Sequence, residues 1–598
     1  MRLMVRMWQR NPLPFPSGSL VNTTVASVLI TSFLLPAFLV SSAFAQTMVA
    51  QRYWITFSDR GEVPGRGTGS VDAYALGISD RALWRRAKVL PADRLIDELD
   101  LPVAPSYIDG VRRTGAVIRA TSRWFNAVSA ELSATQRATV QSLPFVASVS
   151  PVAVFRKNRP EVSLERHSTP LLKRQSTSAL DYGSSLAQLN SIGVVEVHNR
   201  GINGSGVIVG MIDDGFNNLR SHPALKNIKV IAEYDFIQRD SSTSVAPGEY
   251  PGQGGHGAAT LSAVGGFESG KLIGAAYGAS FILAKSEIDS VEIRLEEDLY
   301  VEALEWMEQL GADVVSSSLG YIDWYTNSDL DGQTATTTKA ARIAARKGIL
   351  LVTAMGNEGN YRDPRTQSTG TMIAPADADS IVSVGAMSVD GMLASFSSTG
   401  PTADGRVKPE VVAPGVNVYA VAGASSYGYW NGTSLSTPLT AGVAALVLSA
   451  NPDLTPMEVR ARLTGTARQF KDGSPRTESY PNNFYGWGIV DAARAVVKPG
   501  PPEIPNQFVL RNSFPNPFNG TATIIVDAPS AQQIELAIFT VLGQKVRTLF
   551  KGYSAVGENR FFWRDGLDDA GVRVTSGVYI CRLTAPNSIA STKLVFIK

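Results

Sequence analysis

Continuous apolar runs alternate with amphipathic stretches along the middle of the chain. "GVIVGMID" (206–213) is apolar at almost every position, which is typical of a parallel strand covered on both faces. "VEALEWMEQLGADVVSSSLG" (301–320) has a helical period, then Gly311, then a second apolar run. "TKAARIAARKGILLVTAMGNEG" (338–359) repeats this order around Gly348. The repeated units predict an α/β fold with a doubly wound parallel sheet over residues 181–497.

The segments on either side of this region have other patterns. Residues 46–157 alternate strand-like and helix-like stretches, and Ser133 and Gln136 have the spacing of a capping box at the start of one helix. This pattern predicts a small α+β domain. After the proline-rich linker at 498–507, short runs of alternating apolar and polar residues predict a C-terminal β-sandwich at 508–598.

A polar stretch without an apolar period, residues 158–180, separates the α+β domain from the α/β region. The dibasic pairs Arg156-Lys157 and Lys173-Arg174 make this part of the chain open to proteolytic cleavage. A compact domain followed by a cleavable linker predicts a propeptide and an activation linker, with the maturation cut somewhere between residues 156 and 180.

The first 45 residues have the pattern of an export signal. Three arginines precede the apolar run Val25 to Ala45, and Ala43-Phe44-Ala45 has the small-x-small order that signal peptidase reads. Pro36 interrupts the apolar run, and no later stretch reads as a second span. We therefore expect a signal peptide at 1–45 and no stable membrane span after its removal. A retained membrane anchor is the alternative.

Composition narrows the possible chemistry. The 598 residues exceed what one core supports, and a net charge of +2 without a long basic or acidic block does not imply a nucleic-acid partner. The single cysteine, Cys581, excludes an intrachain disulfide and a cysteine metal cluster. A histidine-based mechanism has four candidates, which are His167, His198, His222 and His256.

Four polar residues stand where the α/β pattern gathers functional groups. Asp213 and Asn357 each follow an apolar strand, and carboxyl ends of strands are where such sheets collect their sites. His256 lies between glycines ahead of a small-residue helix, and Ser434 precedes the apolar helix of "NGTSLSTPLTAGVAALVLSA" (431–450). Singly, each also fits a structural role: a turn, a packed histidine, or a helix cap. A metal site is not favoured, because no second histidine lies at helical spacing from His256.

Taken together, these residues fit nucleophilic catalysis. Asp213 would orient the ring of His256, and His256 would remove the proton of Ser434. Asn357 and the backbone N–H of Ser434 would hold the oxyanion, because a helix N-terminus offers unpaired donors. Ser436 or Thr437 is expected to cap the helix, which leaves Ser434 free. The chain order Asp, His, Ser is that of subtilisin.

Residues 181–497 resemble the subtilisin-like (subtilase) serine peptidases. The motifs that carry the resemblance are "VIVGMIDDGF…SHPAL", "HGAATLSAVGG", "SSSLG", "AMGNEG", "VKPEVVAPG" and "GTSLSTPLTAGVAAL". The resemblance implies Asp213, His256 and Ser434 as the triad and Asn357 as the oxyanion donor. It also implies that Ser318, Leu319 and Gly320 line the substrate cleft, where a bound peptide would add a strand. The chemistry needs no cofactor; structural calcium is frequent in the family, but no site for it can be named.

The sequence departs from the family pattern near the triad. Asp214 stands where Thr or Ser usually follows the catalytic aspartate, and it would either raise a neighbour's pKa if buried or face solvent. Ala258 replaces the usual threonine after the His-Gly pair, and Leu435-Ser436 replaces Met-Ala. No reacting group is lost. We therefore expect an active enzyme with altered hydrogen bonding around the triad.

The flanking domains resemble known companions of such enzymes. The α+β domain looks like a peptidase prodomain, which acts as a folding aid and inhibitor. The last ninety or so residues are similar to the C-terminal sorting domain of type IX secretion substrates through "FPNPFNGTATIIV", "VLGQKVRTL" and "SGVYICRL". This resemblance implies export across both membranes of a Gram-negative bacterium to the medium or cell surface. An accessory sandwich without a sorting role is the alternative.

Two other functions are nucleotide binding and a non-catalytic surface role. The glycines of "GINGSGVIVG" (201–210) come before a strand, whereas a dinucleotide fingerprint needs them after it, and no P-loop sequence occurs. A non-catalytic secreted surface protein that keeps a peptidase fold is the remaining alternative. The sequence favours a secreted serine endopeptidase, made as an inactive precursor, that acts on protein or peptide substrates through an acyl-enzyme. Its own prodomain and the type IX machinery are its expected partners.

Overall fold

The computed structural model describes most of the chain. The described residues are 51–62, 73–152, 154–156, 180–249, 252–287, 294–320, 325–359, 370–497, 507–511, 513, 516–586 and 588–597. The expected signal peptide at 1–45 lies outside them, as do nearly all residues of the two expected linkers.

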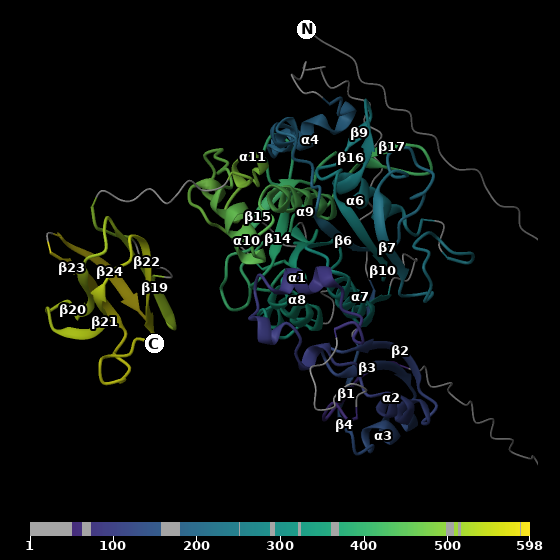
Figure 1. The fold of residues 1–598 in the computed structure, drawn as a ribbon, viewed down its shortest axis with the longest axis horizontal. Helices are drawn as coiled ribbons and strands as arrows, with labels where there is room; N and C mark the ends of the chain where they lie inside the picture. Colours follow the sequence, from purple (N-terminus) through teal and green to yellow (C-terminus); the bar gives the residue numbers. More distant parts are fainter. Residues whose placement is uncertain are drawn as a thin grey trace, which may run out of the picture. The chain divides into compact units, whose positions relative to one another are not determined.

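A seven-stranded parallel sheet forms the centre of the α/β region (Figure 1). Its strands are β6 (Ile208–Asp213), β7 (Lys229–Asp235), β10 (Ser280–Lys285), β12 (Val314–Ser317), β13 (Leu350–Ala354), β14 (Val382–Met387) and β15 (Val411–Pro414). Their order is β15-β14-β13-β12-β6-β10-β7, and each neighbouring pair is parallel. The predicted doubly wound fold is confirmed, with β6 near the middle of the sheet.

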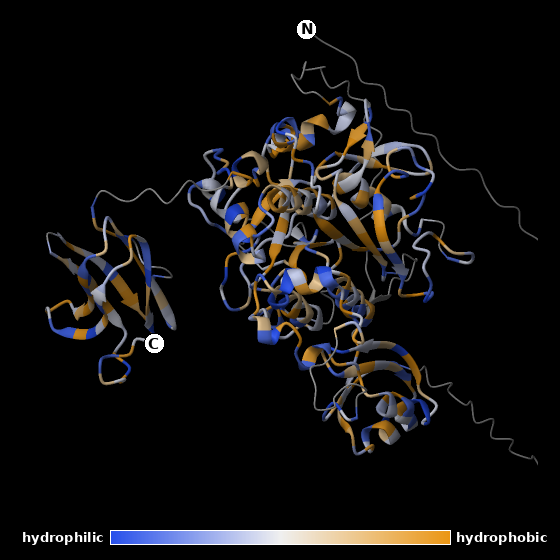
Figure 2. Ribbon diagram, in the orientation of Figure 1, coloured by the Kyte–Doolittle hydropathy of each residue, from blue (hydrophilic) through white to orange (hydrophobic). Residues whose placement is uncertain are grey.

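Helices cover both faces of this sheet. On one face lie α6 (Gly255–Gly265), α9 (Thr433–Ala450) and α10 (Pro456–Gly465), and on the other lie α7 (Glu297–Leu310) and α8 (Thr336–Arg346). Successive residues of β13 enter different cores, because side chains alternate along a strand: Leu350 and Val352 pack with α9, and Leu351 packs with α7 and α8. Both faces are therefore apolar, as the hydropathy colours of the central strands show (Figure 2).

Smaller elements complete the α/β region. They are α4 (Leu186–Ser191), α5 (Val194–Asn199), β8 (Phe267–Glu268), β9 (Leu272–Ile273), β16 (Val418–Val421), β17 (Tyr427–Trp430) and α11 (Ala492–Ala495). Within the described ranges, α9 is the one helix long and apolar enough to cross a membrane, but 83% of its apolar window is buried inside the molecule. It is packed as a core helix of the sheet.

The N-terminal domain is the predicted small α+β unit. Its antiparallel sheet has the order β2-β3-β1-β4. Its elements are β1 (Gln51–Phe57), α1 (Asp80–Arg86), α2 (Pro105–Arg112), β2 (Val117–Ser122), β3 (Ala127–Leu132), α3 (Ala134–Gln141) and β4 (Val146–Pro151). The capping box of Ser133 and Gln136 is present at the start of α3. Beyond this sheet, β5 (Val154–Arg156) pairs antiparallel with β11 (Arg294–Glu296), which immediately precedes α7.

The C-terminal domain is a β-sandwich, as predicted. One sheet has the order β18-β19-β22 and the other β21-β20-β23-β24. The strands are β18 (Val509–Leu510), β19 (Thr521–Ala528), β20 (Gln533–Thr540), β21 (Lys545–Tyr553), β22 (Gly557–Arg564), β23 (Gly577–Ala585) and β24 (Ser588–Phe596). Side chains from both sheets, including Ile524, Trp563 and Leu583, form its core. Cys581 is buried there, and burial raises the pKa of its thiol to about 12.

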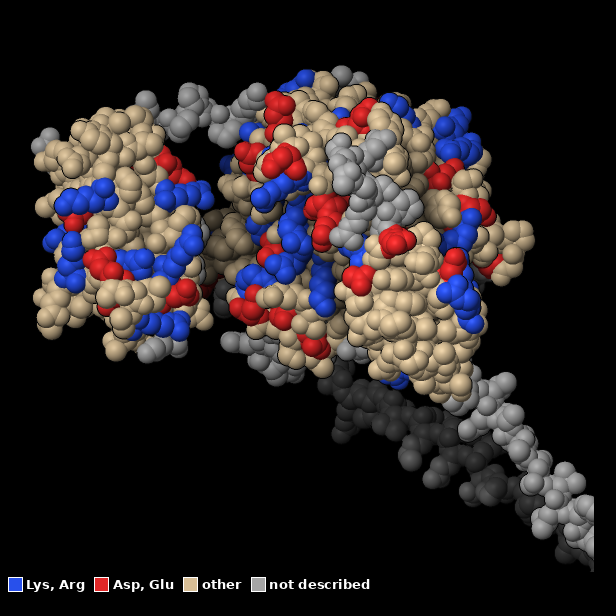
Figure 3. Space-filling view, turned by 60° about the horizontal axis from the view of Figure 1, so that its bottom comes forward, with Lys and Arg blue, Asp and Glu red and all other residues tan. Residues whose placement is uncertain are grey.

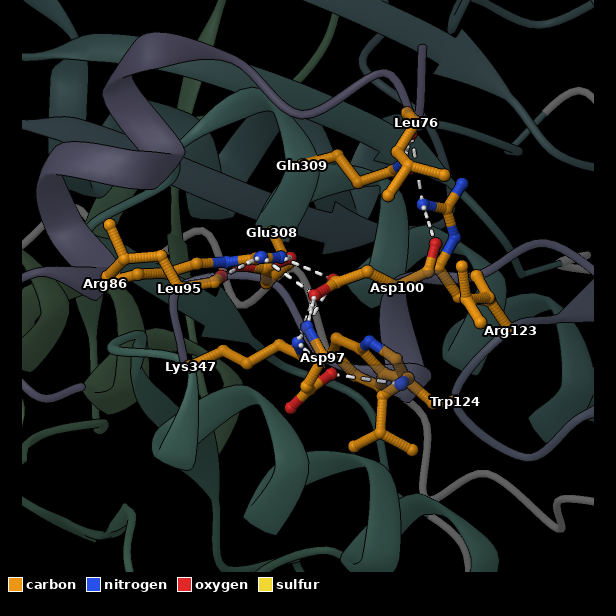
Figure 4. A network of polar contacts seen from close by, with 12 residues as sticks. Leu76, Arg86, Leu95, Asp97, Asp100, Arg123, Trp124, Glu308, Gln309 and Lys347 are labelled. Carbon is orange, nitrogen blue, oxygen red and sulfur yellow. Dashed lines mark hydrogen bonds and ion pairs between the residues drawn. The ribbon is translucent and has the colours of Figure 1, made fainter. Parts of the chain in front are cut away.

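Charged side chains are mixed on the surface, and some form buried clusters, one of which joins the N-terminal domain to the sheet domain. Figure 3 shows basic and acidic residues interspersed over the face in view. The buried cluster lies between the N-terminal domain and the ends of α7 and α8 (Figure 4). Arg86 Nε donates to Glu308 Oε1 at 2.8 Å, and Arg86 Nη2 donates to Asp100 Oδ1 at 2.8 Å. Lys347 Nζ donates to Asp100 at 3.0 Å, so the charges alternate in sign from Glu308 to Lys347.

Each domain contributes one positive and one negative side chain to this row of alternating charges. Glu308 and Lys347 belong to the sheet domain, whereas Arg86 and Asp100 belong to the N-terminal domain, and Glu308 also accepts a hydrogen bond from Arg85. All of these residues are at most 2% exposed. A buried charge that loses its partner is strongly destabilising, so the cluster requires that both domains stay in register.

Glu308→Gln should loosen this contact. The variant leaves Arg85 and Arg86 buried with one fewer negative partner, so the free energy of opening should fall by about 3–5 kcal/mol. Hydrogen exchange of the α1 amides measures this opening. Glu196→Gln is the matched control, because its ion pair with Arg200 is exposed and should contribute less than about 1 kcal/mol. Equal exchange in the two variants would contradict a stabilising role for the buried cluster.

Candidate active site

Asp213 and His256 meet at the carboxyl edge of the central strand. Asp213 is the last residue of β6, and His256 is the second residue of α6. His256 Nδ1 and Asp213 Oδ1 are 2.6 Å apart. The helix can approach the strand this closely because residue 257 is glycine: a Cβ there would lie 2.0 Å from the carbonyl oxygen of Gly215. The approach of α6 to β6 thus requires the glycine that follows His256.

The two groups shift each other's pKa. Burial would raise the pKa of Asp213, but the facing ring of His256 and the donated hydrogen bonds lower it overall. Burial would lower the pKa of His256, but the charge of Asp213, together with those of Asp214 and Glu287, raises it to about 9. Since Nδ1 faces the carboxylate, Nε2 is the ring nitrogen available to accept a proton from a substrate or nucleophile.

Ser434 lies in the first turn of α9. The helix begins at Thr433 after Gly432, which has a φ of +145°, a conformation that favours glycine. The expectation that Ser436 or Thr437 caps this helix is wrong. The Thr437 hydroxyl donates to the carbonyl of Thr433, and the buried Ser436 hydroxyl has no hydrogen-bond partner among the described residues. Both residues lie inside the helix, so neither of them caps its first N–H groups, and the N-cap residue Gly432 has no side chain to do so.

Asn357 is fixed beside this turn by its amide oxygen. Asn357 Oδ1 accepts hydrogen bonds from Thr433 N at 2.9 Å and from Thr433 Oγ1 at 3.1 Å. The amide nitrogen is therefore directed away from Thr433, and a Cβ on Gly432 would lie 3.6 Å from it. The same Cβ would lie 3.6 Å from Ser434 N, so the amide nitrogen and this backbone donor border the same small region, which is the arrangement that binds an oxyanion.

The segment Ser318 to Gly320 follows the end of β12 and contacts Ser434. Ser317 is opposite Ile212 in the parallel register, so Ser318 follows the strand end next to Asp213. Ser318 Oγ donates to the carbonyl of Ser434 at 2.8 Å, and Ser434 Oγ donates to the carbonyl of Ser318 at 3.4 Å. Leu319 is buried, and a Cβ on Gly320 would lie 2.0 Å from the end of the Ile373 side chain, which would have to move to make room for it.

The described contacts join the predicted site residues as two groups. Asp213 and His256 form one, and Ser434, Asn357 and the Ser318 segment form the other. Among the described residues, the hydroxyl of Ser434 is hydrogen-bonded to Ser318 and not to His256. Hydrogen bonds between a nucleophile and its base are often long without substrate and shorten in the bound complex.

Two further residues contact the Asp213–His256 pair. Thr260 Oγ1 donates to Asp213 Oδ2 at 2.9 Å, which the sequence analysis missed. Thr260 lies four residues after His256, so both side chains are on one face of α6, and this spacing in the sequence could have indicated that Thr260 is near the site. Asp214 is fully buried and does not face solvent, and burial together with the charge of Asp213 raises its pKa well above the usual range.

The other described histidines have structural partners. His198 contacts the hydroxyl of Tyr182 and the carbonyl of Ala275, at 2.9 and 3.0 Å. His222 Nδ1 accepts a hydrogen bond from Ala224 N at 3.2 Å. Neither is hydrogen-bonded to the site, so His256 is the candidate base among the described histidines.

The described part of the chain offers one set of acidic and histidine side chains close enough to share an ion. The set is Asp213, Asp214 and His256, whose donor atoms lie within 4.8 Å of one another. Their atoms are already engaged: Asp213 with His256 and Thr260, and Asp214 with two backbone N–H groups. We therefore assign these residues to the site chemistry and name no residues for calcium.

Comparisons with known proteins show which family and which relatives this chain is similar to. The family model described as the subtilase family matches residues 204–488, and the model described as the peptidase S8 propeptide domain of Bacteroidota matches residues 52–167. The chain is 32% identical over 300 residues to subtilisin DY from Bacillus licheniformis, covering 50% of this chain and 94% of that protein. It is 33% identical over 302 residues to subtilisin Savinase from Lederbergia lenta, covering 50% and 93%.

A third relative covers the same region. The chain is 31% identical over 320 residues to the serine protease AprX from Bacillus subtilis, covering 49% of this chain and 67% of AprX. The α/β sheet, the N-terminal propeptide domain and these similarities lead to one conclusion. The chain belongs to the subtilase family, as a subtilisin-like serine endopeptidase that is made as a zymogen.

Proposed function

We propose that this zymogen matures to a secreted serine endopeptidase whose triad is Asp213, His256 and Ser434, with Asn357 as oxyanion donor. The observation that carries the proposal is the 2.6 Å contact between His256 Nδ1 and Asp213 Oδ1. It holds the ring of His256 with Nε2 free, on the sheet edge that also presents Ser434 and Asn357. A non-catalytic role would not need a buried, charged pair at this edge, because an unpaired or idle charge is costly to bury.

The proposed reaction proceeds in two halves. His256 Nε2 takes the hydroxyl proton as Ser434 Oγ bonds to the scissile carbonyl carbon, and Asp213 stabilises the charged ring. The oxyanion accepts hydrogen bonds from Asn357 and from Ser434 N. The ring then protonates the leaving amine as the C–N bond breaks. Water attacks the acyl ester with His256 as base, and the carboxyl product leaves as the serine hydroxyl is restored. No cofactor takes part.

We assign Ser318, Leu319 and Gly320 to the substrate cleft. The assignment is supported by the carbonyl of Ser318, which lies 3.4 Å from the proposed nucleophile. A peptide whose scissile carbonyl reaches Ser434 would pass along this segment and would pair with its backbone as an added strand.

The proposed domain limits follow the sequence pattern. They are a signal peptide at 1–45, a prodomain at 46–157, an activation linker at 158–180, a peptidase domain at 181–497, a linker at 498–507 and a sorting domain at 508–598. The pairing of β5 with β11 supports a maturation cut after this point, because it places the end of the prodomain as an added strand on the peptidase domain. The prodomain would inhibit the enzyme until this cut is made and the prodomain is released.

The proposed destination is the medium or the cell surface of a Gram-negative bacterium, reached through the type IX machinery. Its support is the sandwich architecture of residues 508–598 together with the three sorting-like stretches named above. An accessory sandwich without a sorting role remains the alternative and is distinguished by the truncation below.

Ser434→Ala should abolish labelling by a fluorophosphonate probe. The probe forms a covalent bond only with an activated serine, so mature wild-type protein should be labelled at Ser434 and the variant should not. Ser436→Ala is the matched control, because this buried serine lies two residues further along α9 and should leave labelling intact. Mass spectrometry locates the label. Unlabelled wild-type protein after confirmed prodomain removal would favour the non-catalytic alternative.

Asn357→Ala should slow acylation by about 10²–10³-fold without loss of the fold, because it removes one oxyanion donor. Single-turnover kinetics with a chromogenic peptide amide measure the rate. Asn451→Ala changes a buried asparagine at the opposite end of α9 and should leave the acylation rate near that of wild type. A near-normal rate in Asn357→Ala would refute the oxyanion assignment.

Truncation after residue 497 should separate catalysis from delivery. Without the C-terminal sandwich, peptidase activity should persist, whereas the protein should stay in the periplasm of a host that has a type IX system. Fractionation of medium, surface and periplasm, with the full chain beside it, checks the outcome. Surface delivery of the truncated chain would rule out the sorting role.

A further inference from the structure

Two polar side chains surround the Asp213–His256 pair in an arrangement that departs from the family pattern. Residues 214 and 258, where the family usually has hydroxyl side chains, are Asp and Ala here. Thr260, one helical turn beyond His256, supplies a hydroxyl instead. Asp214 and Thr260 are both fully buried.

Thr260 binds Oδ2 of Asp213, the carboxylate oxygen that does not contact His256. Asp213 Oδ1 accepts from His256 Nδ1 at 2.6 Å and from Asp214 N at 2.9 Å, while Oδ2 accepts from Thr260 Oγ1 at 2.9 Å. The carbonyl of Gly257 lies 3.0 Å from the same hydroxyl, but the carboxylate is the stronger acceptor because it is charged. Both oxygens of Asp213 are thereby held, and the carboxylate cannot rotate away from the ring.

Asp214 caps the helix that carries His256. The N-cap residue of α6 is Gly254, which has no side chain to satisfy the first N–H groups. Asp214 Oδ2 accepts from Gly254 N at 3.1 Å, and Oδ1 accepts from Gly257 N at 2.8 Å. A carboxylate from the end of β6 thus replaces the missing cap and ties the first turn of α6 to the strand that carries Asp213.

We propose that Asp214 and Thr260 are positioning residues of the triad, which together fix the imidazole of His256 against Asp213 and hold its protonated form. The inference rests on the triad proposed above. Thr260 acts by fixing the orientation of the carboxylate. Asp214 acts by fixing the first turn of α6 and, when it is ionised, by adding a second negative charge next to the ring.

The charge of Asp214 has a consequence for pH dependence. The acidic groups that face the ring of His256 are Asp213 at the end of β6, Asp214 after it, and Glu287 beyond the end of β10. With them, the pKa of His256 rises to about 9 although burial opposes the rise. The ring must be neutral to act as a base, so activity should increase as pH rises through this alkaline range. Burial and the charge of Asp213 raise the pKa of Asp214 well above its usual range, so Asp214 contributes its charge to this effect only at pH values at which it is ionised.

The first test measures the ring directly, without catalysis. In the full chain carrying Ser434→Ala, NMR titration of the His256 ring should give a pKa well above the ordinary value of about 6.5. Adding Asp214→Asn should lower it by about one unit or more, because one adjacent negative charge is removed. Asp377→Asn is the matched control: Asp377 is equally buried and accepts from Gly332 N at 2.8 Å, but it has no contact with the triad. A His256 pKa that is unchanged or raised in Asp214→Asn overturns the role of Asp214.

The second test measures the orientation of Asp213. In the mature enzyme, Thr260→Val should lower kcat/KM about tenfold or more, and Thr260→Ser should restore most of it by returning the hydroxyl. Thr440→Val is the control, because the buried Thr440 hydroxyl donates only within α9, to the carbonyl of Ser436. An unchanged kcat/KM in Thr260→Val, or no rescue by serine, overturns the role of Thr260. Failure of the wild-type enzyme to react with the fluorophosphonate probe would instead refute the proposed triad. The NMR titration of His256 does not depend on that reaction, so the two failures can be told apart.

Discussion

The hydrogen bond between His256 and Asp213 is the interaction around which this molecule is arranged. A carboxylate at the end of a buried strand is stable only where donors surround it, and here a ring, a backbone N–H and a hydroxyl do so. The contact requires α6 to begin directly against β6. The glycine at position 257 permits this approach, since any side chain there would collide with the carbonyl of Gly215. The end of β6, the start of α6 and the small residues nearby together allow the short distance between His256 Nδ1 and Asp213 Oδ1.

The parallel sheet explains why segments far apart in sequence can cooperate. Neighbouring strands β6, β12 and β13 end on the same edge, so Asp213, Ser318 and Asn357 are presented together although 144 positions separate the first from the last. The helix α9 crosses beneath these strands and brings Ser434 to the same edge. The N-cap residue Gly432 has no side chain, and Asn357 binds the first N–H of the helix, which is consistent with a site where the next N–H, that of Ser434, meets a developing negative charge.

The precursor uses buried charge in a second place. Helix α7 presents acidic residues to the N-terminal domain: Asp298 accepts from Arg52, Glu305 from Ser122, and Glu308 from Arg86. Buried ion pairs add little net stability but strongly penalise a missing or misplaced partner. The contact therefore selects this propeptide in this register. Once the propeptide leaves, these carboxylates gain water, which lowers the cost of separation.

The order and type of the elements follow from the sequence alone, because hydrophobic period and turn residues act locally along the chain. The sequence also brought forward Asp213, His256, Ser434 and Asn357, since strand ends, glycine neighbours and helix starts are visible as short patterns. Only the tertiary structure decided what surrounds them. The hydroxyl of Thr260 resembles that of any buried helical threonine until α6 is packed on β6, and Asp214 reads equally well as an exposed turn residue. The capping roles expected for Ser436 and Thr437 failed for the same reason: where a helix starts depends on the chain that leads into it, and here Gly432 and Asn357 fix that start through contacts made across the fold.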